Sequence, residues 1–227
     1  EDVKSNFTTG FSGYTVSASG TLALMRASSW RVPRRLVWVD RAGAEQEVLP
    51  GQEEWAEPRL SPDGRRIALT KEGLINQLWL FDVQRKALTQ LTNTAGVSFD
   101  AVWMPDSKSI LYTSEQGGNN RPQIYQVTLE TGWSERVTFE GTYNSKAAML
   151  ADGKNMVLIH REDVSDDFHL TIMNLERGSI RILTDTSLDE SPTIAPNASM
   201  VMYASKSGGR GILNAVSIDG RVKYQLP

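Results

Sequence analysis

Short apolar runs alternate with polar turns along the whole chain, and the same turn chemistry returns at regular intervals. One such turn is the tetrapeptide Ser61-Pro62-Asp63-Gly64, which separates two apolar runs. Related tetrapeptides begin at residues 17, 104, 150 and 195, so the period is about 45 residues. Asp or Asn with Gly supplies the backbone positions at φ > 0 that tight hairpins require. The pattern therefore predicts a repeated pair of antiparallel strands, one on each side of every turn.

Two further runs follow each hairpin and complete a unit of four strands. The run after the turn covers residues 21–25, 66–70, 109–113, 155–159 and 199–203 in the five copies. A third apolar run comes next, at residues 36–40, 78–82, 123–127, 170–174 and 213–217. The fourth run ends on Leu or Val followed by Thr or Pro, as in Leu91-Thr92 and Leu183-Thr184. Because no segment combines a sustained 3.6-residue apolar period with capping signals, we expect almost no helix.

A unit of four strands in roughly 40 to 50 residues has the length of a propeller blade, which buries its faces against its neighbours. A two-sheet sandwich has a similar density of strands, but it does not explain why one turn chemistry recurs in phase. We therefore predict a single all-β domain over residues 1–227, a β-propeller with five blades at approximately 11–50, 51–94, 95–140, 141–186 and 187–227. An incomplete six-bladed ring is the alternative, and an incomplete ring would favour self-association.

Composition supports a packed domain and narrows its partners. The 227 residues are 40% hydrophobic and 22% charged, with a net charge of −3 and no cysteine. The scattered charges give no basic surface for nucleic acid, and a chain without cysteine has neither disulfides nor thiolate chemistry. No apolar run approaches the roughly 20 residues that span a bilayer, and the first ten residues are too polar for a signal sequence. Because the chain does not begin with Met, we expect a processed or excised segment.

Catalytic chemistry has little support in the sequence. No Gly-x-Ser-x-Gly motif occurs, and the two histidines, His160 and His169, lie at the two ends of one loop. They supply at most two ligands to a metal, so we expect a noncatalytic protein. Trp55 and Trp133 lie in or next to connecting segments, where a tryptophan either joins the core or forms an exposed anchor for another protein.

Several segments resemble the TolB-like propeller family. Residues 58–68, with the sequence PRLSPDGRRIA, are similar to its repeat. From about residue 112 the chain more closely resembles the propeller of the TolB proteins of the bacterial Tol–Pal system, through segments 121–125, 136–141, 188–197 and 214–221. The first 70 residues instead resemble TolB-like propellers attached to bacterial serine/threonine kinases. This difference suggests a chimera of two propellers, recombined in nature or engineered.

The resemblance implies a periplasmic platform for protein binding, whose partner is a lipoprotein like Pal, the peptidoglycan-associated lipoprotein. In the family, the segments that lead into the first strand of each blade lie at the mouth of the central channel. By position, this implies the partner-binding residues Ser98, Phe99, Asp100, Asn144, Ser145, Asp189, Glu190 and Ser191. Two other roles stay open, which are a recombined or engineered scaffold without a native ligand and a sensor or accessory propeller from a kinase or peptidase.

Metal binding at this mouth is a separate question. The carboxylates of Glu57, Asp100, Asp189 and Glu190 could converge near the axis and hold Ca²⁺, which takes about six to eight oxygen ligands. Their spacing alone does not establish such a site, so we expect no cofactor. We also expect no insertion into a membrane.

Overall fold

The computed structural model describes residues 33–118, 121–207 and 210–226, together with the backbone of residues 5–6, 11–12, 14–16 and 22–25. All regular secondary structure in these residues is β-strand, which confirms the all-β prediction. No helix that could cross a membrane occurs in this part of the chain. The short strands β1 (Ser5–Asn6) and β2 (Phe11–Ser12) pair with each other.

The remaining strands form five antiparallel sheets of four strands, each in sequence order. The first sheet contains β3 (Tyr14–Val16), β4 (Leu22–Met25), β5 (Arg34–Val39) and β6 (Glu45–Glu53). The second contains β7 (Trp55–Leu60), β8 (Arg66–Lys71), β9 (Gln77–Asp82) and β10 (Ala87–Gln90). The third contains β11 (Ser98–Trp103), β12 (Ser109–Ser114), β13 (Gln123–Thr128) and β14 (Ser134–Arg136). The fourth contains β15 (Tyr143–Met149), β16 (Asn155–Arg161), β17 (His169–Asn174) and β18 (Ile180–Ile182). The fifth contains β19 (Glu190–Ile194), β20 (Met200–Ser207), β21 (Arg210–Ser217) and β22 (Lys223–Gln225).

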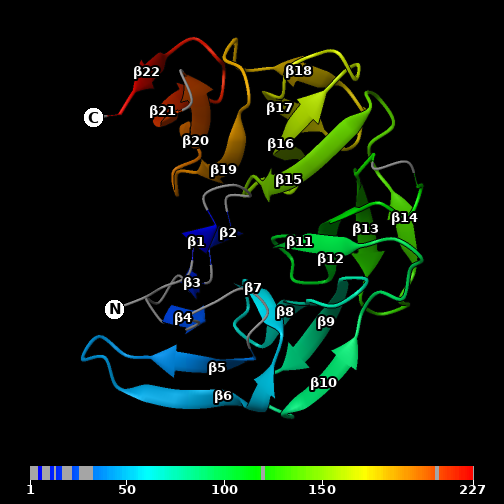
Figure 1. Cartoon of the computed structure of the whole chain (residues 1–227), viewed down its shortest axis with the longest axis vertical. Helices are drawn as coiled ribbons and strands as arrows, with labels where there is room; N and C mark the ends of the chain where they lie inside the picture. The colour runs from blue at the N-terminus through cyan, green and yellow to red at the C-terminus, as the bar shows by residue number, and fades with distance from the viewer. Residues whose placement is uncertain are drawn as a thin grey trace.

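The five sheets follow one another along an arc (Figure 1). The strands β7, β11, β15 and β19 lie towards its inner edge, and β10, β14 and β18 lie on the outer side. The first and fifth sheets lie at the two ends of the arc. Among the described strands, pairing never crosses from one four-stranded sheet to another. This arrangement confirms the predicted propeller of five blades, although pairing among the described strands does not close it into a ring.

The hairpin turns explain the repeated tetrapeptides. In each of four turns an Asp or Asn side chain accepts a hydrogen bond from the backbone N–H two residues further on, at 2.8 to 3.1 Å. The residue after that side chain has a positive φ, as predicted. These residues are Gly64 (72°), Ser107 (59°), Gly153 (66°) and Ala198 (54°). Two of the four turns therefore hold a residue with a Cβ in a conformation that favours glycine.

The apolar core lies between the sheets, in four successive layers. Each layer joins a sheet to the next one along the chain, through pairs such as Leu36 and Phe81, Leu78 and Trp103, Leu111 and Met156, and Leu170 and Tyr203. Trp55 is buried in the first of these layers, whereas Trp133 is exposed. Because the layers lie on both sides of the second, third and fourth sheets, each of these sheets depends on its neighbours for burial.

The turn at Ala198 gives a direct test of backbone strain. An L-residue in the left-handed region costs about 1 kcal/mol, so Ala198→Gly should raise the free energy of unfolding by up to about 1 kcal/mol, measured by urea denaturation. As a control, Ala87→Gly on the exposed part of β10 should lower it by about 0.5 to 1 kcal/mol. A decrease of similar size in both variants would contradict the strain at Ala198.

Candidate functional site

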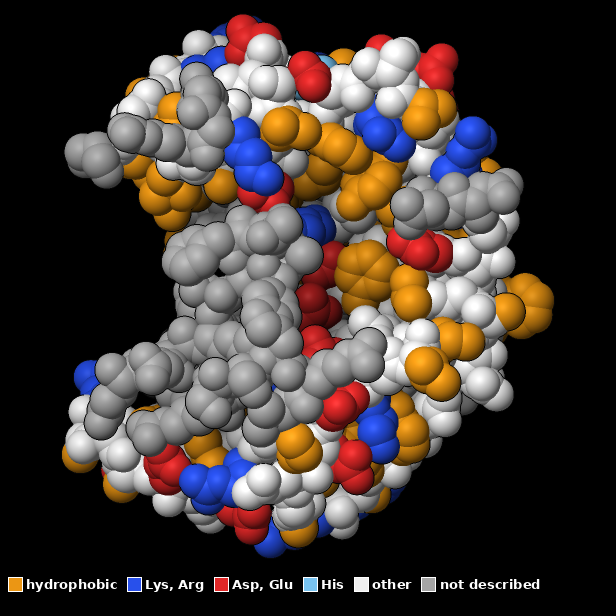
Figure 2. Space-filling view, in the orientation of Figure 1, with side chains coloured by type: hydrophobic (Ala, Val, Ile, Leu, Met, Phe, Trp, Pro, Cys, Tyr) orange, Lys and Arg blue, Asp and Glu red, His pale blue; other side chains and the backbone are white. Residues whose placement is uncertain are grey.

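Four inner strands carry the same irregularity at the same place. The pairing of β7, β11, β15 and β19 with the following strand shifts in register, which marks a β-bulge in each. At every bulge one non-glycine residue has a φ between 50° and 57°. We call these the bulge residues, and they are Glu57, Asp100, Lys146 and Ser191. Bulges re-aim side chains, and Figure 2 shows acidic and basic side chains at the inner edge of the arc, where these strands run.

The first two bulge residues link the second sheet to the third. Glu57 Oε2 accepts hydrogen bonds from the backbone N–H of Asp100 (2.9 Å) and from the Thr70 hydroxyl (3.0 Å). Asp100 Oδ2 is buried, and no hydrogen-bond partner for it occurs among the described residues. Burial raises the pKa of Asp100 well above its ordinary value and the Glu57 carboxylate adds to this, while Lys146 lowers it. Asp100 therefore holds a proton more tightly in the folded chain than in the unfolded chain.

A similar link joins the third sheet to the fourth. The backbone N–H of the bulge residue Lys146 donates to the Thr113 hydroxyl at 3.3 Å. The hydroxyl of the fourth bulge residue, Ser191, is buried, and the described residues provide no partner for it. The bulge residues thus place a mixed set of carboxyl, ammonium and hydroxyl groups along the inner strands.

Three of the predicted partner-binding residues, Ser98, Asn144 and Asp189, lie two residues before a bulge residue and are buried. Ser98 Oγ lies 3.3 Å from Ser114 Oγ, and Asn144 Nδ2 donates to Gln123 Oε1 at 2.9 Å. These polar side chains are therefore engaged in hydrogen bonds inside the protein. Direct contact with a partner stays a prediction for them.

Asp189 takes part in a hydrogen-bond arrangement around a threonine that recurs in three sheets. In three sheets a buried threonine follows the outer strand. Its hydroxyl accepts a hydrogen bond, at 2.9 Å, from a backbone N–H on the third strand of the same sheet. These residues are Thr92, Thr138 and Thr184. In the second and third sheets the hydroxyl donates to Gln77 or Gln123. In the fourth sheet His169 stands in place of the glutamine, and Thr184 donates to Asp189 instead. Burial raises the pKa of Asp189, and the hydrogen bonds that it accepts act in the opposite direction.

The other predicted residues lie closer to solvent or lack a partner. Phe99 and Glu190 are partly exposed, and a Glu190 carboxylate oxygen lies 4.0 Å from the Lys206 ammonium group. Ser145 is buried, and its hydroxyl has no hydrogen-bond partner among the described residues. Asp100 and Ser191 are partly exposed as well, but Asp100 Oδ2 and the Ser191 hydroxyl are buried, so Phe99 and Glu190 offer the clearest access to a partner.

The four carboxylates considered for Ca²⁺ do not gather at one point. Glu57 and Asp100 are neighbours, whereas Asp189 is held by threonine hydroxyls and Glu190 lies near Lys206. Within the described residues, no group of three or more His, Cys, Asp or Glu side chains could hold a metal ion. Binding of Ca²⁺ stays a prediction, and the described residues do not bring its four candidate carboxylates together.

Asn144 also contacts His160, one of the two histidines that the sequence singled out. Its Oδ1 lies 2.8 Å from His160 Nδ1, and His160 Nε2 lies 3.1 Å from Glu162 Oε2. His160 is buried and is paired with His169 across β16 and β17. Because Asn144 Nδ2 donates to Gln123 and to the Glu140 carbonyl, its Oδ1 is left to accept from the imidazole. His160 is therefore part of a hydrogen-bond network that connects the fourth sheet to Gln123 of the third.

Four-stranded sheets that pack face to face along an arc define a β-propeller. The sequence pattern of the PD40 family, described as the TolB beta propeller domain, matches residues 35–227, so the chain belongs to this family.

Relatives named Tol-Pal system protein TolB match parts of the chain. The protein of Pseudomonas fluorescens is 54% identical over 77 residues, which are 34% of this chain and 18% of that protein. The protein of Nitrosospira multiformis is 45% identical over 105 residues, which are 45% of this chain and 24% of that protein. The crystal structure of TolB from Acinetobacter baumannii has a TM-score of 0.80 and 32% identity, and the match covers 91% of this chain and 51% of that one. The matched part of the chain thus spans about half or less of each relative.

Enzymes also share the fold. The structure of a puromycin-hydrolyzing peptidase from Mycobacterium tuberculosis has a TM-score of 0.73 at 18% identity, and the match covers 95% of this chain and 37% of that one. At this identity the likeness extends to the fold alone.

The raised pKa of Asp100 predicts a specific pH dependence. Since the folded state binds the proton more tightly, the free energy of unfolding falls as pH rises from the unfolded carboxyl value of about 4 through the folded value. Asp100→Asn removes this loss, so the variant should gain stability over the parent chain as pH rises from about 4 to about 8. Thermal melts across this range measure the difference. Parallel pH profiles for the two proteins would refute a protonated Asp100.

The buried Asn144 predicts a large loss of stability on truncation. Asn144→Ala leaves both His160 Nδ1 and Gln123 Oε1 short of a partner, so the free energy of unfolding should fall by about 2 to 3 kcal/mol. The control Asn93→Ala changes an exposed loop residue and should stay within about 0.5 kcal/mol of the parent. Urea denaturation compares the two, and equal effects would mean that the network contributes little.

Proposed function

We propose that the chain is a noncatalytic platform that binds another protein outside the cytoplasm, in a role of the Tol–Pal type. Membership of the TolB beta propeller domain family supports a protein partner. The relatives named Tol-Pal system protein TolB support a lipoprotein like Pal as that partner. The binding surface is the end of the propeller that carries the loops between the second and third strands and the segments that enter the inner strands.

Exposed apolar side chains at this end carry the proposal. Leu74, in the loop between β8 and β9, is 99% exposed, and Phe139, between β14 and β15, is 73% exposed. Val164, between β16 and β17, and Leu188, just before β19, are also exposed. Antiparallel order brings all of these connections to the same end of their sheets. An exposed apolar set with a polar surround is typical of a surface that binds protein.

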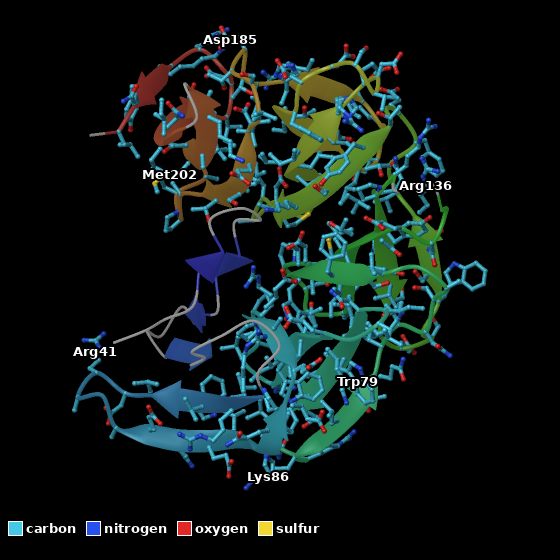
Figure 3. The ribbon with its side chains drawn as sticks, in the orientation of Figure 1. Arg41, Trp79, Lys86, Arg136, Asp185 and Met202 are labelled. Atoms are coloured by element: carbon cyan, nitrogen blue, oxygen red, sulfur yellow. The ribbon has the colours of Figure 1, made fainter. Side chains whose placement is uncertain are left out.

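Arginine and aromatic side chains extend this surface between the third and fourth sheets. The guanidinium carbon of Arg136, labelled in Figure 3, lies 5.3 Å from the centre of the Phe139 ring. Arg161 lies 4.7 Å from the Phe168 ring centre, and the Phe168 and Tyr143 rings meet edge to face at 4.8 Å. Arginine and aromatic residues are enriched where protein interfaces bind most strongly.

The predicted mouth residues have two kinds of role in this proposal. Phe99 and Glu190 retain exposed surface and contact the partner directly. The buried residues Ser98, Asn144 and Asp189 hold the entry segments in place, so they act on binding through position. The bulge residues set the charge at the centre of the surface.

Calorimetric titration with the soluble domain of a Pal lipoprotein from a Pseudomonas species tests the proposal. We expect saturable binding, and Phe139→Ala should weaken it at least about fivefold because an exposed aromatic contact is lost. Trp133→Ala is the matched control, since Trp133 is 68% exposed but lies in the turn between β13 and β14, at the opposite end.

Two results would overturn this function. Absence of binding at high micromolar concentration would remove the Pal partner and favour a scaffold without a ligand or an accessory propeller. Equal weakening by Phe139→Ala and Trp133→Ala would mean that the surface is not the one proposed.

A further inference from the structure

The fifth sheet packs on one face only, as far as the described residues go. Val201 and Tyr203 of β20 pack against Leu170 and Val157 of the fourth sheet. On the opposite face lie Met202, Leu213 and Tyr224, which are 41%, 45% and 49% exposed. Strand register places these three on one side, because Met202 pairs with Ala215, Ala215 pairs with Tyr224, and Ala204 pairs with Leu213. We call this side the outer face of the fifth sheet, and Figure 3 labels Met202 at this end of the arc.

The outer face repeats the positions that other sheets bury against a neighbour. In the fourth sheet Val157 pairs with Ile172, as Met202 pairs with Ala215 in the fifth. Ile159 pairs with Leu170 in the fourth sheet, as Ala204 pairs with Leu213 in the fifth. Val157 and Leu170 are fully buried because the fifth sheet covers them. In the second sheet, Ala68 and Leu78 are fully buried in the same way under the third. The outer face therefore continues a surface type that this protein covers with another sheet of its own kind.

The other end of the arc does not offer a matching free surface. Leu36 of β5 packs towards the second sheet, so the adjacent Val37 lies on the opposite face of the first sheet. Val37 is buried, and the exposed side chains described on this face are charged, with Arg35 and Glu45 3.4 Å apart, so it offers no exposed apolar surface like that of the fifth sheet. If a second copy packed head to tail, its first sheet would have to offer a free apolar face to the fifth sheet of this copy. A two-fold dimer instead brings together the outer faces of two fifth sheets and needs no other surface.

The charges on the outer face suit such a pairing. Glu190 and Lys206 lie on this side, since Glu190 pairs with Ala204 and Lys206 follows Ala204 by two residues. Their charged groups are 4.0 Å apart, at the edge of the apolar residues. Because they have opposite signs, two copies in antiparallel contact can exchange these pairs across the interface without placing like charges together.

We propose that two copies of the chain form a two-fold dimer through the outer faces of their fifth sheets. Met202, Leu213 and Tyr224 form the apolar centre, and Glu190 and Lys206 lie at its edge. The proposal does not depend on the binding of Pal, because the exposed loop residues proposed for that contact lie at the end of the sheets. Only Glu190, at the edge of this face, is shared with the surface proposed for Pal.

Sedimentation equilibrium between about 1 µM and about 1 mM protein tests the dimer. The parent chain should shift from monomer to dimer with concentration and grow no further. Leu213→Lys should weaken association at least tenfold, because it places a charge at the centre of the apolar contact. Ile182→Lys is the control, since Ile182 of β18 is 53% exposed outside this face, and it should associate like the parent.

A single introduced cysteine gives a second measurement that does not rely on a charged variant. The chain contains no cysteine, so Met202→Cys provides one thiol per copy. Mild oxidation should link this variant into covalent dimers far faster than Ile182→Cys, with far-ultraviolet circular dichroism confirming the fold of both. A parent chain that stays monomeric over the whole range would overturn the proposal. So would assembly beyond the dimer, equal association of Leu213→Lys and the parent, or equal rates of cross-linking.

Discussion

A β-sheet with two apolar faces is stable in water only when both faces are covered, and this constraint shapes the whole molecule. Each interior blade contributes one layer of side chains to the sheet before it and one to the sheet after it. Ile110 and Leu111, for example, are adjacent on β12 and belong to different layers on opposite sides of the third sheet. Folding energy is therefore held mainly between blades, and a change at one layer is felt by the two sheets that share it.

Polar groups reinforce the same boundaries. The threonine that follows an outer strand ties that strand to its own sheet, and Asp189 extends one of these ties to the next blade. Glu57 and Lys146 connect neighbouring blades through backbone amides at the bulges. Because these groups are partly shielded from water between two blades, their charge and hydrogen bonding are coupled to how closely the blades pack. The protonation of Asp100 is thus a property of the contact between two blades and not of one residue.

The repeat made the fold predictable, because turn chemistry and strand length are local properties. The paired Leu-Thr ends were visible too, yet the role of the Thr92 hydroxyl depends on Gln77, which lies 15 positions away and meets it only in the folded sheet. Bulges were not visible, since a bulge is a mismatch between two strands and leaves no mark in either one alone. Asp189 and Glu190 illustrate the same limit. They are adjacent in sequence, but the alternation of a strand sends one to threonines and the other towards Lys206.

The bulges affect which substitutions this propeller can accept in evolution. Four different side chains occupy one backbone conformation, and none of them is the glycine that this conformation favours. The peptide geometry at the inner strands is thus set by the surrounding ladder and tolerates an acid, a base or an alcohol at the same position. Substitutions there can reverse the local electrostatic potential while the scaffold stays intact. The four bulge residues are therefore positions at which side chains can be exchanged, so that the same fold can acquire a preference for different ligands.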